Sequence, residues 1–511
     1  MARQTRVTHN EHDTHGTHDT APLGGSPAGP EAAGQVLVAS NRGPVSYALG
    51  ADGSLTAKRG GGGLVSGLSA LEPGTGTWVC AALGDGDRAA AGRRPGGRLD
   101  PADTGGQVVR MLDIPPDTFD AAYNGIANSV LWFVHHLLYQ TPFEPVFDAG
   151  FEEQWEHYEA YNAAFADALA AEAAPGAAVL VQDYHLSLVP GLLRERRPDL
   201  RVGHFSHTPW APPELFRVLP DAVARRVLLG ILGADRAAFL TERWARAFAD
   251  CCADLLGAEV NGWEVTHEGR TTRLGVHGLG SDAAFLRDRA FRPDVDERLA
   301  ALREQVGDVR TIVRVDRTEL SKNIVRGLLA FRRLLTDRPR WRGQVTHIAF
   351  AYPSRQDLAV YREYTAEVSR VAEEINAAFG TEGWTPVVLH VKDDFARSLA
   401  AYRMADVALV NPIRDGMNLV AKEVPVVSER GCALVLSREA GAAAELGEDA
   451  LLVNPYDIAG TAQALHLALT MDVDERDRRT KRLSAAATAL PPKTWFLEQL
   501  TALGAPPAGA A

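Results

Sequence analysis

The stretch Arg414-Asp-Gly-Met-Asn-Leu-Val-Ala-Lys-Glu423 follows a short apolar run, Asp406–Val410. This order is typical of a buried strand that ends in a glycine turn and then enters a helix. Such a turn directs backbone N–H groups beyond the carboxyl end of the strand, where they can bind a diphosphate. Asp415 can accept hydrogen bonds from sugar hydroxyls, and Glu423 from the paired hydroxyls of a ribose. The stretch therefore predicts a sugar-nucleotide site. Taken alone, Asp415 could instead cap the helix and Glu423 lie on a solvated face.

The rest of the chain predicts an α/β fold made of two doubly wound units. Short apolar runs alternate with longer helical patterns from Val36 onward, as in parallel sheets covered by helices on both faces. Expected strands are Val36–Ala39, Ala177–Val181, Arg201–Ser206, Thr311–Val315, Val345–Ala351, Pro386–Val391, Asp406–Val410, Cys432–Leu436 and Leu451–Val453. Expected helices in the first half are Leu64–Leu71, Glu153–Ala171 and Glu214–Leu232.

Length and local composition suggest the domain limits. A chain of 511 residues exceeds what one hydrophobic core usually serves. The glycine-rich stretch Gly275–Gly280 gives way to charged, proline-containing sequence, so we place a boundary there. We expect a His-, Gly- and Pro-rich tail over 1–33, a first domain over 34–285 and a second over 286–485. A helix over 486–503 should pack back on the first domain, and 504–511 should form a second unstructured tail.

Composition excludes several classes of protein. The formal net charge of −12 argues against general binding to nucleic acids or acidic membranes. No apolar run approaches membrane-spanning length, and the start of the chain lacks the pattern of a signal peptide. The four cysteines show no metal-ligand spacing, which favours a reducing, cytoplasmic location. Assembly into homo-oligomers stays open.

Polar residues follow several of the expected strands. Open α/β sheets bind ligands outside the carboxyl ends of their strands, so these residues are candidates for a common site. They are Arg42 and the glycine run Gly60–Gly63 after the first strand, Asp183 and His207 after the next two, and Arg355 after Val345–Ala351. Any one of them alone is as well explained by a structural role.

Two cations follow Thr311–Val315 in the segment Asp316-Arg-Thr-Glu-Leu-Ser-Lys-Asn323. Arg317 and Lys322 can clamp a diphosphate and neutralise the charge that grows on it as a glycosidic bond breaks. The alternative is a surface charge cluster in which Glu319 is an ion-pair partner.

These motifs, taken in order from about Gln35 to about Leu500, resemble those of the trehalose-6-phosphate synthases, a retaining glycosyltransferase family with the two-domain GT-B fold. The resemblance implies transfer of glucose from GDP-glucose or UDP-glucose to glucose 6-phosphate. It implies Arg317, Lys322, Asp183, His207 and Asp415 as catalytic residues. Donor-binding residues would be Gly62, Gly63, Gly416, Met417, Asn418, Leu419, Val420 and Glu423. Acceptor-binding residues would be Arg42, Tyr123, Trp132, Asp183 and Arg355.

The sequence departs from the family pattern at several points. A usual His-Asp-Tyr-His is Gln182-Asp-Tyr-His185 here, and a usual Ser-Lys-Gly is Ser321-Lys-Asn323. Pro425 follows Glu423 closely, so we expect a short or kinked helix there. The Ala-, Arg- and Gly-rich composition resembles actinobacterial members, some of which prefer GDP-glucose. No residue that reads the nucleotide base is identifiable.

The expected enzyme needs no metal and no cofactor, because cations of the protein meet the charge of the leaving group and no Asp-x-Asp motif is required. One alternative is a related transferase, or pseudo-glycosyltransferase, with another phosphorylated acceptor such as glycerol 3-phosphate or a cyclitol phosphate. A catalytically silent regulator that binds sugar phosphates is another. A nicotinamide-dependent dehydrogenase is disfavoured, since Gly60–Gly63 lacks the Gly-x-Gly-x-x-Gly spacing.

Overall fold

The computed structural model describes residues 34–60 and 76–504. The predicted helix Leu64–Leu71, the donor-site candidates Gly62 and Gly63, and both predicted tails except Gly504 lie outside the described residues. No helix in the described ranges is long and apolar enough to cross a membrane.

A nine-stranded sheet forms the first domain. Its strands lie in the order β5 (Val108–Leu112), β4 (Gly76–Ala81), β1 (Val36–Ala39), β6 (Ala178–Gln182), β7 (Arg201–Ser206), β8 (Arg236–Phe239), β11 (Arg270–Val276), β10 (Glu264–His267) and β9 (Glu259–Asn261). Pairing is parallel from β5 to β11 and antiparallel at the β11–β10–β9 edge. A separate antiparallel hairpin joins β2 (Val45–Leu49) to β3 (Leu55–Arg59).

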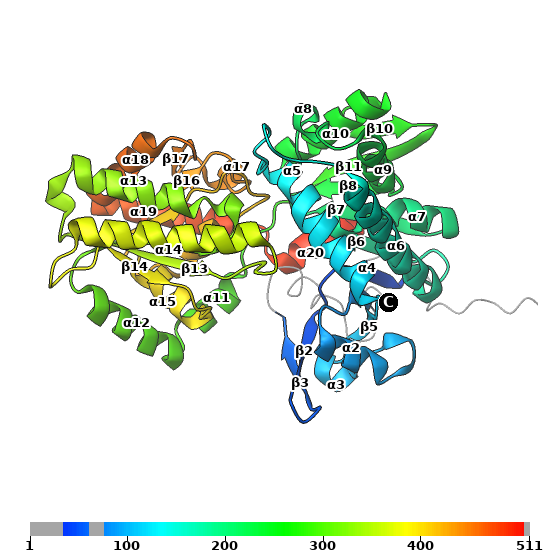
Figure 1. The fold of residues 1–511 in the computed structure, drawn as a ribbon, viewed down its shortest axis with the longest axis horizontal. Helices are drawn as coiled ribbons and strands as arrows, with labels where there is room; N and C mark the ends of the chain where they lie inside the picture. Colours follow the sequence, from blue (N-terminus) through cyan, green and yellow to red (C-terminus); the bar gives the residue numbers. More distant parts are fainter. Residues whose placement is uncertain (1–33, 61–75, 505–511) are drawn as a thin grey trace, which may run out of the picture.

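A six-stranded, fully parallel sheet forms the second domain. Its order is β14 (Val387–His390), β13 (Val345–Tyr352), β12 (Arg310–Arg317), β15 (Val407–Val410), β16 (Ala433–Ser437) and β17 (Leu451–Val453). Every residue of β13 and β15 is buried, as expected for strands covered on both faces. Figure 1 shows the two domains side by side, the second drawn mainly in yellow and orange. The predicted α/β class with two doubly wound sheets is confirmed.

Helices connect the parallel strands. In the first domain they are α2 (Asp85–Gly92), α3 (Pro101–Thr104), α4 (Pro116–Asp120), α5 (Trp132–His136), α6 (Ala149–Glu172), α7 (Val189–Arg196), α8 (Pro213–Phe216), α9 (Asp221–Leu232) and α10 (Glu242–Leu256). The following helices are α11 (Ala283–Ala290), α12 (Pro293–Val306), α13 (Ile324–Asp337), α14 (Ala359–Phe379), α15 (Phe395–Met404), α16 (Leu419–Val427), α17 (Ala443–Leu446), α18 (Ile458–Thr470), α19 (Val473–Ala487) and α20 (Pro492–Ala502). The boundary predicted at 285/286 falls within α11.

One predicted helix differs from those observed, and a second is short. The single helix predicted over Glu214–Leu232 is wrong, because α8 ends at Phe216 and α9 begins after Pro220. Proline disfavours a helical conformation of the residue before it, so the chain restarts the helix there. The helix that carries Glu423 was predicted to be short or kinked. Helix α16 is short, nine residues, and Pro425 lies inside it two residues before its end at Val427.

The last helix returns to the first sheet. Trp495, Phe496 and Leu500 of α20 are fully buried. The Trp495 ring packs edge-on against Phe205 of β7, with 4.9 Å between ring centroids. Figure 1 shows α20, in red, beside β6 and β7 rather than with the other late helices. Burial of these aromatic side chains stabilises the packing of α20 against the first domain.

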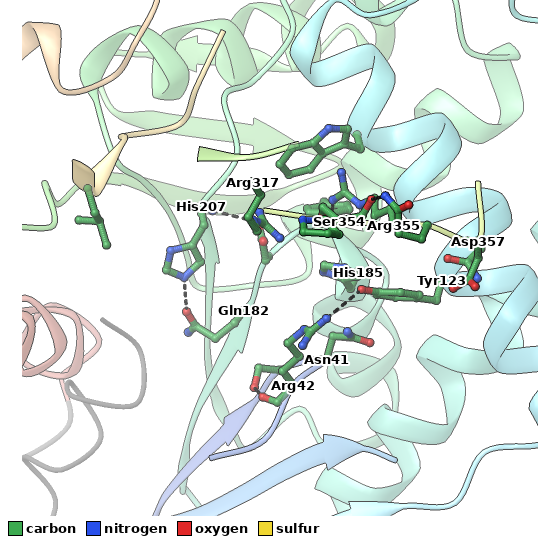
Figure 2. A pocket seen from close by; sticks show the side chains of 18 of the residues that line it. Asn41, Arg42, Tyr123, Gln182, His185, His207, Arg317, Ser354, Arg355 and Asp357 are labelled. Carbon is green, nitrogen blue, oxygen red and sulfur yellow. Dashed lines mark hydrogen bonds between the residues drawn. The ribbon is translucent and has the colours of Figure 1, made fainter. Parts of the chain in front are cut away.

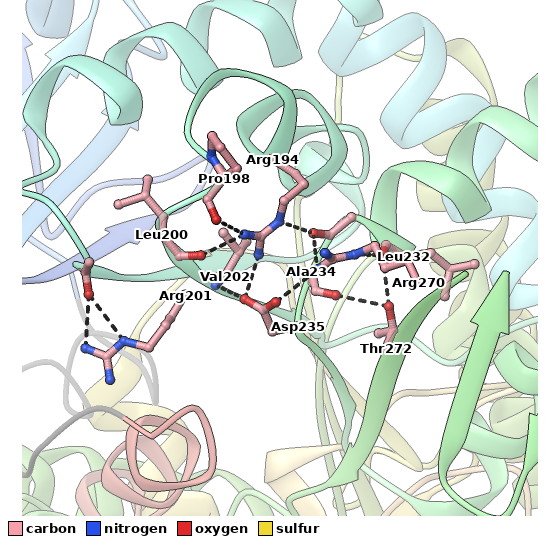
Figure 3. A network of polar contacts seen from close by, with 12 residues as sticks. Arg194, Pro198, Leu200, Arg201, Val202, Leu232, Ala234, Asp235, Arg270 and Thr272 are labelled. Atoms are coloured by element: carbon pink, nitrogen blue, oxygen red, sulfur yellow. Dashed lines mark hydrogen bonds and ion pairs between the residues drawn. The ribbon is translucent and has the colours of Figure 1, made fainter. Parts of the chain in front are cut away.

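An arginine network joins the amino ends of β7, β8 and β11 (Figure 3). Arg194 Nη2 donates to Asp235 Oδ2 at 2.6 Å, and Arg270 Nη2 donates to Asp235 Oδ1 at 2.9 Å. The backbone N–H of Val202 donates to the same carboxylate at 2.8 Å. The remaining guanidinium donors of Arg194 reach the carbonyl oxygens of Pro198, Leu200 and Gly233. The network therefore closes the end of the sheet opposite the strand-end motifs.

Candidate active site

A pocket of about 810 Å³ lies at the carboxyl ends of strands from both sheets. Figure 2 shows its polar side chains gathered around one space. Its lining residues come from the first domain up to Leu279 and from the second domain thereafter: Ser40, Asn41, Arg42, Tyr123, Asn124, Trp132, Gln182, Asp183, Tyr184, His185, His207, Leu279, Arg317, Pro353, Ser354, Arg355, Gln356, Asp357 and Leu419. A ligand in this pocket would therefore contact both domains at once.

Left-handed backbone conformations concentrate around this pocket. Four of the six non-glycine residues with positive φ in the described ranges belong to strand-to-helix connections here: Asp183 (φ 70°), Asn323 (φ 59°), Arg355 (φ 48°) and Asn418 (φ 80°). Such conformations cost free energy and persist where the surrounding structure enforces them, commonly at functional sites. Three of the four were predicted to bind substrate.

Arg42 and Tyr123 form one wall of the pocket. Arg42 Nη2 donates to the Tyr123 hydroxyl at 3.4 Å, and the Tyr123 ring stacks on His185 with 5.6 Å between centroids. Burial works to raise the pKa of Tyr123, but Arg42 and Arg355 outweigh it and leave the pKa below its ordinary value. Tyr123 lies in a π-helix, Ala121–Leu131, between α4 and α5, a feature that often marks functional sites. This wall presents a cation and a phenol to a ligand.

Arg355 reaches into the pocket from the second domain. Its guanidinium carbon lies 4.1 Å from the centroid of the Trp132 ring, and Nη2 donates to the Tyr184 hydroxyl at 3.3 Å. Both aromatic residues belong to the first domain, so Arg355 ties the two domains together at the ligand site. Stacking on an indole face favours a guanidinium over an ammonium group.

Glu319 forms an ion pair with Arg355. Its side chain is fully buried, and its Oε2 accepts from Arg355 Nη1 at 2.5 Å while Oε1 accepts from Ser354 Oγ at 2.7 Å. Arg317 Nη1 lies 3.5 Å from the same carboxylate. The alternative of a solvated surface cluster around Glu319 is therefore wrong. We expected Arg317 to bind the donor and Arg355 the acceptor. Glu319 contacts both of these cations, a role that its position in a polar segment did not reveal.

Asp183 and His207 meet at the ends of β6 and β7. The backbone N–H of His207 donates to Asp183 Oδ1 at 3.0 Å. The His207 Nε2 atom lies 2.9 Å from Gln182 Oε1, the glutamine that replaces a family histidine. Burial raises the pKa of Asp183 to about 6 and lowers that of His207 to about 4. At pH 7 the pair is thus a carboxylate beside a neutral imidazole, and neither is placed as a proton relay to the other.

The predicted donor-binding stretch, Arg414–Glu423, lies beside the pocket. Lys322 Nζ donates to Asp415 Oδ2 at 2.5 Å, and Asn418 Nδ2 donates to the same oxygen at 3.1 Å. Burial works to lower the pKa of Lys322, but Asp415 outweighs it and raises the pKa. Helix α16 begins at Leu419, which lines the pocket together with Arg317, and the residue before it, Asn418, shares Asp415 with Lys322. This is a suitable place for a diphosphate.

Glu423 lies one turn into α16, and its side chain makes no hydrogen bond or ion pair with any residue that the structure describes. Burial raises its pKa to about 7. A partly buried carboxylate without donors is unfavourable until a ligand supplies them. Its predicted role, accepting from ribose hydroxyls, fits this environment.

Gly416 stands where no side chain fits. A Cβ atom at this position would lie 1.9 Å from the carbonyl oxygen of His207. A Cβ atom at Gly441 would lie 1.8 Å from the carbonyl oxygen of Gly416. The segment Asp415–Asn418, which we call the donor turn, is therefore packed directly against the backbone of the first domain. This close contact explains the glycine in the sequence motif.

Asn323 explains one departure from the family pattern. It has φ 59°, a conformation that glycine adopts freely and that asparagine tolerates better than most residues. Its Nδ2 atom donates to the carbonyl oxygens of Asn411 and Pro455. The substitution of asparagine for a usual glycine thus keeps the same backbone and adds two hydrogen bonds.

The structure places the predicted residues in two adjoining groups. Arg42, Tyr123, Trp132, Asp183, His207, Arg317, Arg355 and Leu419 line the pocket. Asp415, Gly416, Met417, Asn418, Val420 and Glu423 lie beside it on the donor turn and α16, and Lys322 lies beside Asp415 on the connection from β12 to α13. Within the described ranges, no group of three or more His, Cys, Asp or Glu side chains is arranged to hold a metal ion.

Comparison with known proteins identifies the family. Residues 34–504 match the profile described as Glycosyltransferase family 20. The chain belongs to this family. The family 20 relatives include the trehalose-6-phosphate synthase of Mycobacterium avium, 35% identical over 481 residues that cover 91% of this chain and 94% of that protein. The bifunctional trehalose-6-phosphate synthase/phosphatase of Thermoproteus tenax is 36% identical over 382 residues, 74% of this chain. The chain spans about half of that longer protein, 51%.

A solved structure extends the likeness to the fold. The Escherichia coli protein described as "Trehalose-6-phosphate from E. coli bound with UDP-2-fluoro glucose" superposes with a TM-score of 0.81 at 29% identity. The match covers 92% of this chain and 98% of that one. The chain therefore has the GT-B fold, as predicted.

Proposed function

We propose that this family 20 chain is an α,α-trehalose-phosphate synthase. It transfers glucose from a nucleoside-diphosphate glucose, GDP-glucose or UDP-glucose, to glucose 6-phosphate and forms trehalose 6-phosphate. The observation that carries the proposal is one pocket lined by three guanidinium groups, those of Arg42, Arg317 and Arg355, with Lys322 held by Asp415 beside it. Two phosphate-bearing substrates can meet there. The names of the Mycobacterium avium relative and the Escherichia coli complex support both substrates.

The acceptor is assigned to the wall that both domains build. Arg42, Tyr123 and Arg355 would hold the 6-phosphate, since two guanidinium groups and a phenol offer several donors to its oxygens. Trp132 would pack on the sugar, and Asp183 would accept from a sugar hydroxyl. Because Arg355 comes from the second domain, binding of the acceptor phosphate also favours the closed arrangement of the domains.

The donor is assigned to the turn and the start of α16. Arg317, Lys322 and the N–H groups of Leu419 and Val420 would hold the diphosphate. Asp415, the segment Gly416–Asn418 and His207 would hold the glucose, and Glu423 would accept from the ribose hydroxyls. A neutral His207 suits this role, since its Nε2–H donates to Gln182 Oε1 and leaves Nδ1 as an acceptor for a sugar hydroxyl.

The chemistry needs no protein nucleophile. The bond from the glucose anomeric carbon to the diphosphate oxygen breaks, and a bond to the anomeric oxygen of glucose 6-phosphate forms on the same face. The proton of that hydroxyl passes to a phosphate oxygen of the leaving group, so the anomeric configuration is retained. Arg317 and Lys322 stabilise the charge that develops on the diphosphate. We therefore expect turnover without a divalent metal ion or cofactor.

The expected partners are the two small substrates, with no nucleic acid and no membrane. All four cysteines are free and buried, which is compatible with the cytoplasmic location that we propose. Association into homo-oligomers is a matter for a sizing experiment.

The test is mass-spectrometric product analysis of the purified protein given glucose 6-phosphate, with UDP-glucose and GDP-glucose in separate reactions and EDTA in both. A disaccharide monophosphate in either reaction supports the transferase and names its donor. Product that forms only when Mg²⁺ replaces EDTA would overturn the metal-independent mechanism. No product under any of these conditions would overturn the proposed activity and favour another acceptor or a silent regulator.

A further inference from the structure

The donor turn is held by hydrogen bonds to three consecutive carbonyl oxygens. Gly441 N donates to Asp415 O at 3.0 Å, and Ala442 N donates to Met417 O at 2.8 Å. Both of these donors belong to the second domain. The middle carbonyl, that of Gly416, accepts instead from the indole Nε1 of Trp244 at 3.0 Å. Trp244 lies on α10 of the first domain, so one of the three supports of the turn comes from across the domain interface.

Trp244 is the centre of a cluster in which the two domains interlock. Its side chain is buried, with 1% exposed. The guanidinium carbons of Arg243 and Arg414 lie 4.9 Å and 4.6 Å from its ring centroid. Arg414 Nη2 in turn donates to the carbonyl oxygen of Trp210 at 2.8 Å. A ring between two guanidinium groups has little freedom to move, so its N–H is aimed at one place.

A second link runs through Glu439. Arg243 Nη2 donates to Glu439 Oε2 at 2.7 Å, and the carbonyl oxygen of Glu439 accepts from Asp415 N at 3.3 Å. Adjacent residues of α10 therefore hold the donor turn by two routes, one at Gly416 and one through the backbone beside Asp415. Helix α10 makes contact with the donor turn although none of its residues lines the pocket.

Peptide geometry connects these supports to the ligand side of the turn. In a planar trans peptide the N–H points opposite to the preceding C=O. The N–H groups of Gly416, Met417 and Asn418 therefore point away from the groups that hold the carbonyls of Asp415, Gly416 and Met417. These three N–H groups have no acceptor among the residues of the described ranges. They are free to bind the hydroxyls of a sugar.

We propose that Trp244 is a positioning residue for the donor. Its indole N–H fixes the Gly416–Met417 peptide, and the Met417 N–H on the far side then meets the glucose of the nucleotide sugar. The inference rests on the proposed function, because the ligand of the turn is taken to be the nucleoside-diphosphate glucose. It makes assembly of the donor site depend on the packing of the first domain against the second.

The test compares Trp244→Phe with Trp263→Phe in steady-state kinetics. Phenylalanine keeps a buried aromatic ring and removes the donor, which leaves the Gly416 carbonyl without its partner. Trp263 is the matched control, since Arg246 of the same helix stacks on it at 5.0 Å and it is 39% exposed, away from the donor turn. KM is measured for the donor that the wild-type protein uses, at saturating glucose 6-phosphate, and then for the acceptor at saturating donor.

We expect Trp244→Phe to raise the donor KM by about tenfold, the factor that corresponds to loss of one well-placed hydrogen bond. The acceptor KM should stay within about twofold, and Trp263→Phe should change neither. Arg243→Ala provides a second variant that leaves the buried ring in place, because the Arg243 side chain is 51% exposed. It should raise the donor KM by a smaller factor, about threefold, through the Glu439 route.

The outcomes separate the inference from the proposed function. A wild-type protein with no activity on either donor counts against the proposed function itself. An active wild type combined with an unchanged donor KM in Trp244→Phe overturns the positioning role. Equal increases in both KM values would also overturn it, since they would show that Trp244 supports the fold in general.

Discussion

Arginines cluster at the amino ends of the first sheet and again at the pocket where the carboxyl ends of both sheets meet, but the two clusters use their donors differently. At the amino ends, Arg194 and Arg270 share Asp235 and direct their remaining donors to backbone carbonyls (Figure 3). At the carboxyl ends, Arg42 makes one contact, to Tyr123, and Arg317 makes one ion pair, at 3.5 Å, with Glu319 among the described residues (Figure 2). Most donors of the first cluster are used within the protein. The second presents its charge to an open pocket.

The difference shows how a structural arginine is told from a functional one. A guanidinium group whose donors are all used stabilises the chain around it and has nothing left for a ligand. A guanidinium group that faces a cavity contributes less to folding and can bind a substrate phosphate. Strand direction decides which cluster forms where, because ligands bind outside the carboxyl ends of parallel strands.

The largest effect is expected from Arg317→Ala. Loss of the cation beside the diphosphate should lower kcat by about a thousandfold, since charge stabilisation in the transition state is a large term in catalysis. The side chain is 56% exposed, so the fold should be unaffected. Initial rates measure kcat, and circular dichroism checks that the fold is retained. Arg270→Ala is the matched control at the amino ends of the first sheet and should retain the wild-type rate. A comparable loss of rate in this variant would contradict the distinction between the two clusters.

The next largest effect is expected from Arg355→Ala. We expect the KM for glucose 6-phosphate to rise by about a hundredfold, because a buried, hydrogen-bonded cation is lost and Glu319 loses its shortest ion pair. The KM for the donor should change much less. Full saturation curves for each substrate measure the two KM values separately. An acceptor KM close to that of the wild type would show that Arg355 does not bind the acceptor phosphate.

A smaller effect on stability is expected from Asp235→Ala. The carboxylate accepts from two arginines and from the Val202 N–H, but it is 41% exposed, so solvent screens part of each interaction. We expect the free energy of unfolding to fall by about 2 kcal/mol, with kcat and both KM values retained. Urea denaturation measures the change. Unchanged stability would mean that the cluster of Arg194, Asp235 and Arg270 does not support the fold as we infer.

The smallest effect concerns the pH dependence of the donor KM. Burial raises the pKa of Glu423 to about 7, and the protonated carboxyl group loses its capacity to accept from both ribose hydroxyls. The donor KM should therefore rise as the pH falls below 7, by up to about tenfold for each pH unit. Donor titrations at saturating acceptor between pH 5.5 and 8 measure it. Glu423→Gln should give a raised KM that is independent of pH, and a wild-type KM that is flat over this range would contradict the role.

Much of the fold and the site was predictable from the sequence. The buried strands are continuous apolar runs, and the motifs Arg42, Asp183, His207, Arg317 and Arg355 follow them directly. Parallel pairing then brings their side chains to the same edge of each sheet, and the resemblance to the GT-B fold predicts that the two edges face one cleft. The donor turn was predictable for a similar reason, since Gly416 and Asn418 are residues suited to close approach and to positive φ.

Other features depend on contacts that local sequence does not encode. Strands β4 and β5 lie beside the expected strands but carry no strong alternating pattern, and the π-helix Ala121–Leu131 has no sequence signature. Glu319 lies in a charged segment and is buried only because Ser354 and Arg355 arrive from another strand end. Trp244 has the pattern of an ordinary core residue on an amphipathic helix, and only the structure shows its N–H at the donor turn.

The most direct test of the whole account is the nuclear magnetic resonance spectrum of the product made from ¹³C-labelled glucose 6-phosphate and an unlabelled nucleoside-diphosphate glucose. We predict a non-reducing disaccharide with two α-anomeric protons, the label in the phosphorylated ring and none in the other. A β-configured anomeric centre, a linkage to any other hydroxyl, or label that stays in the monosaccharide would contradict the assignment of this pocket.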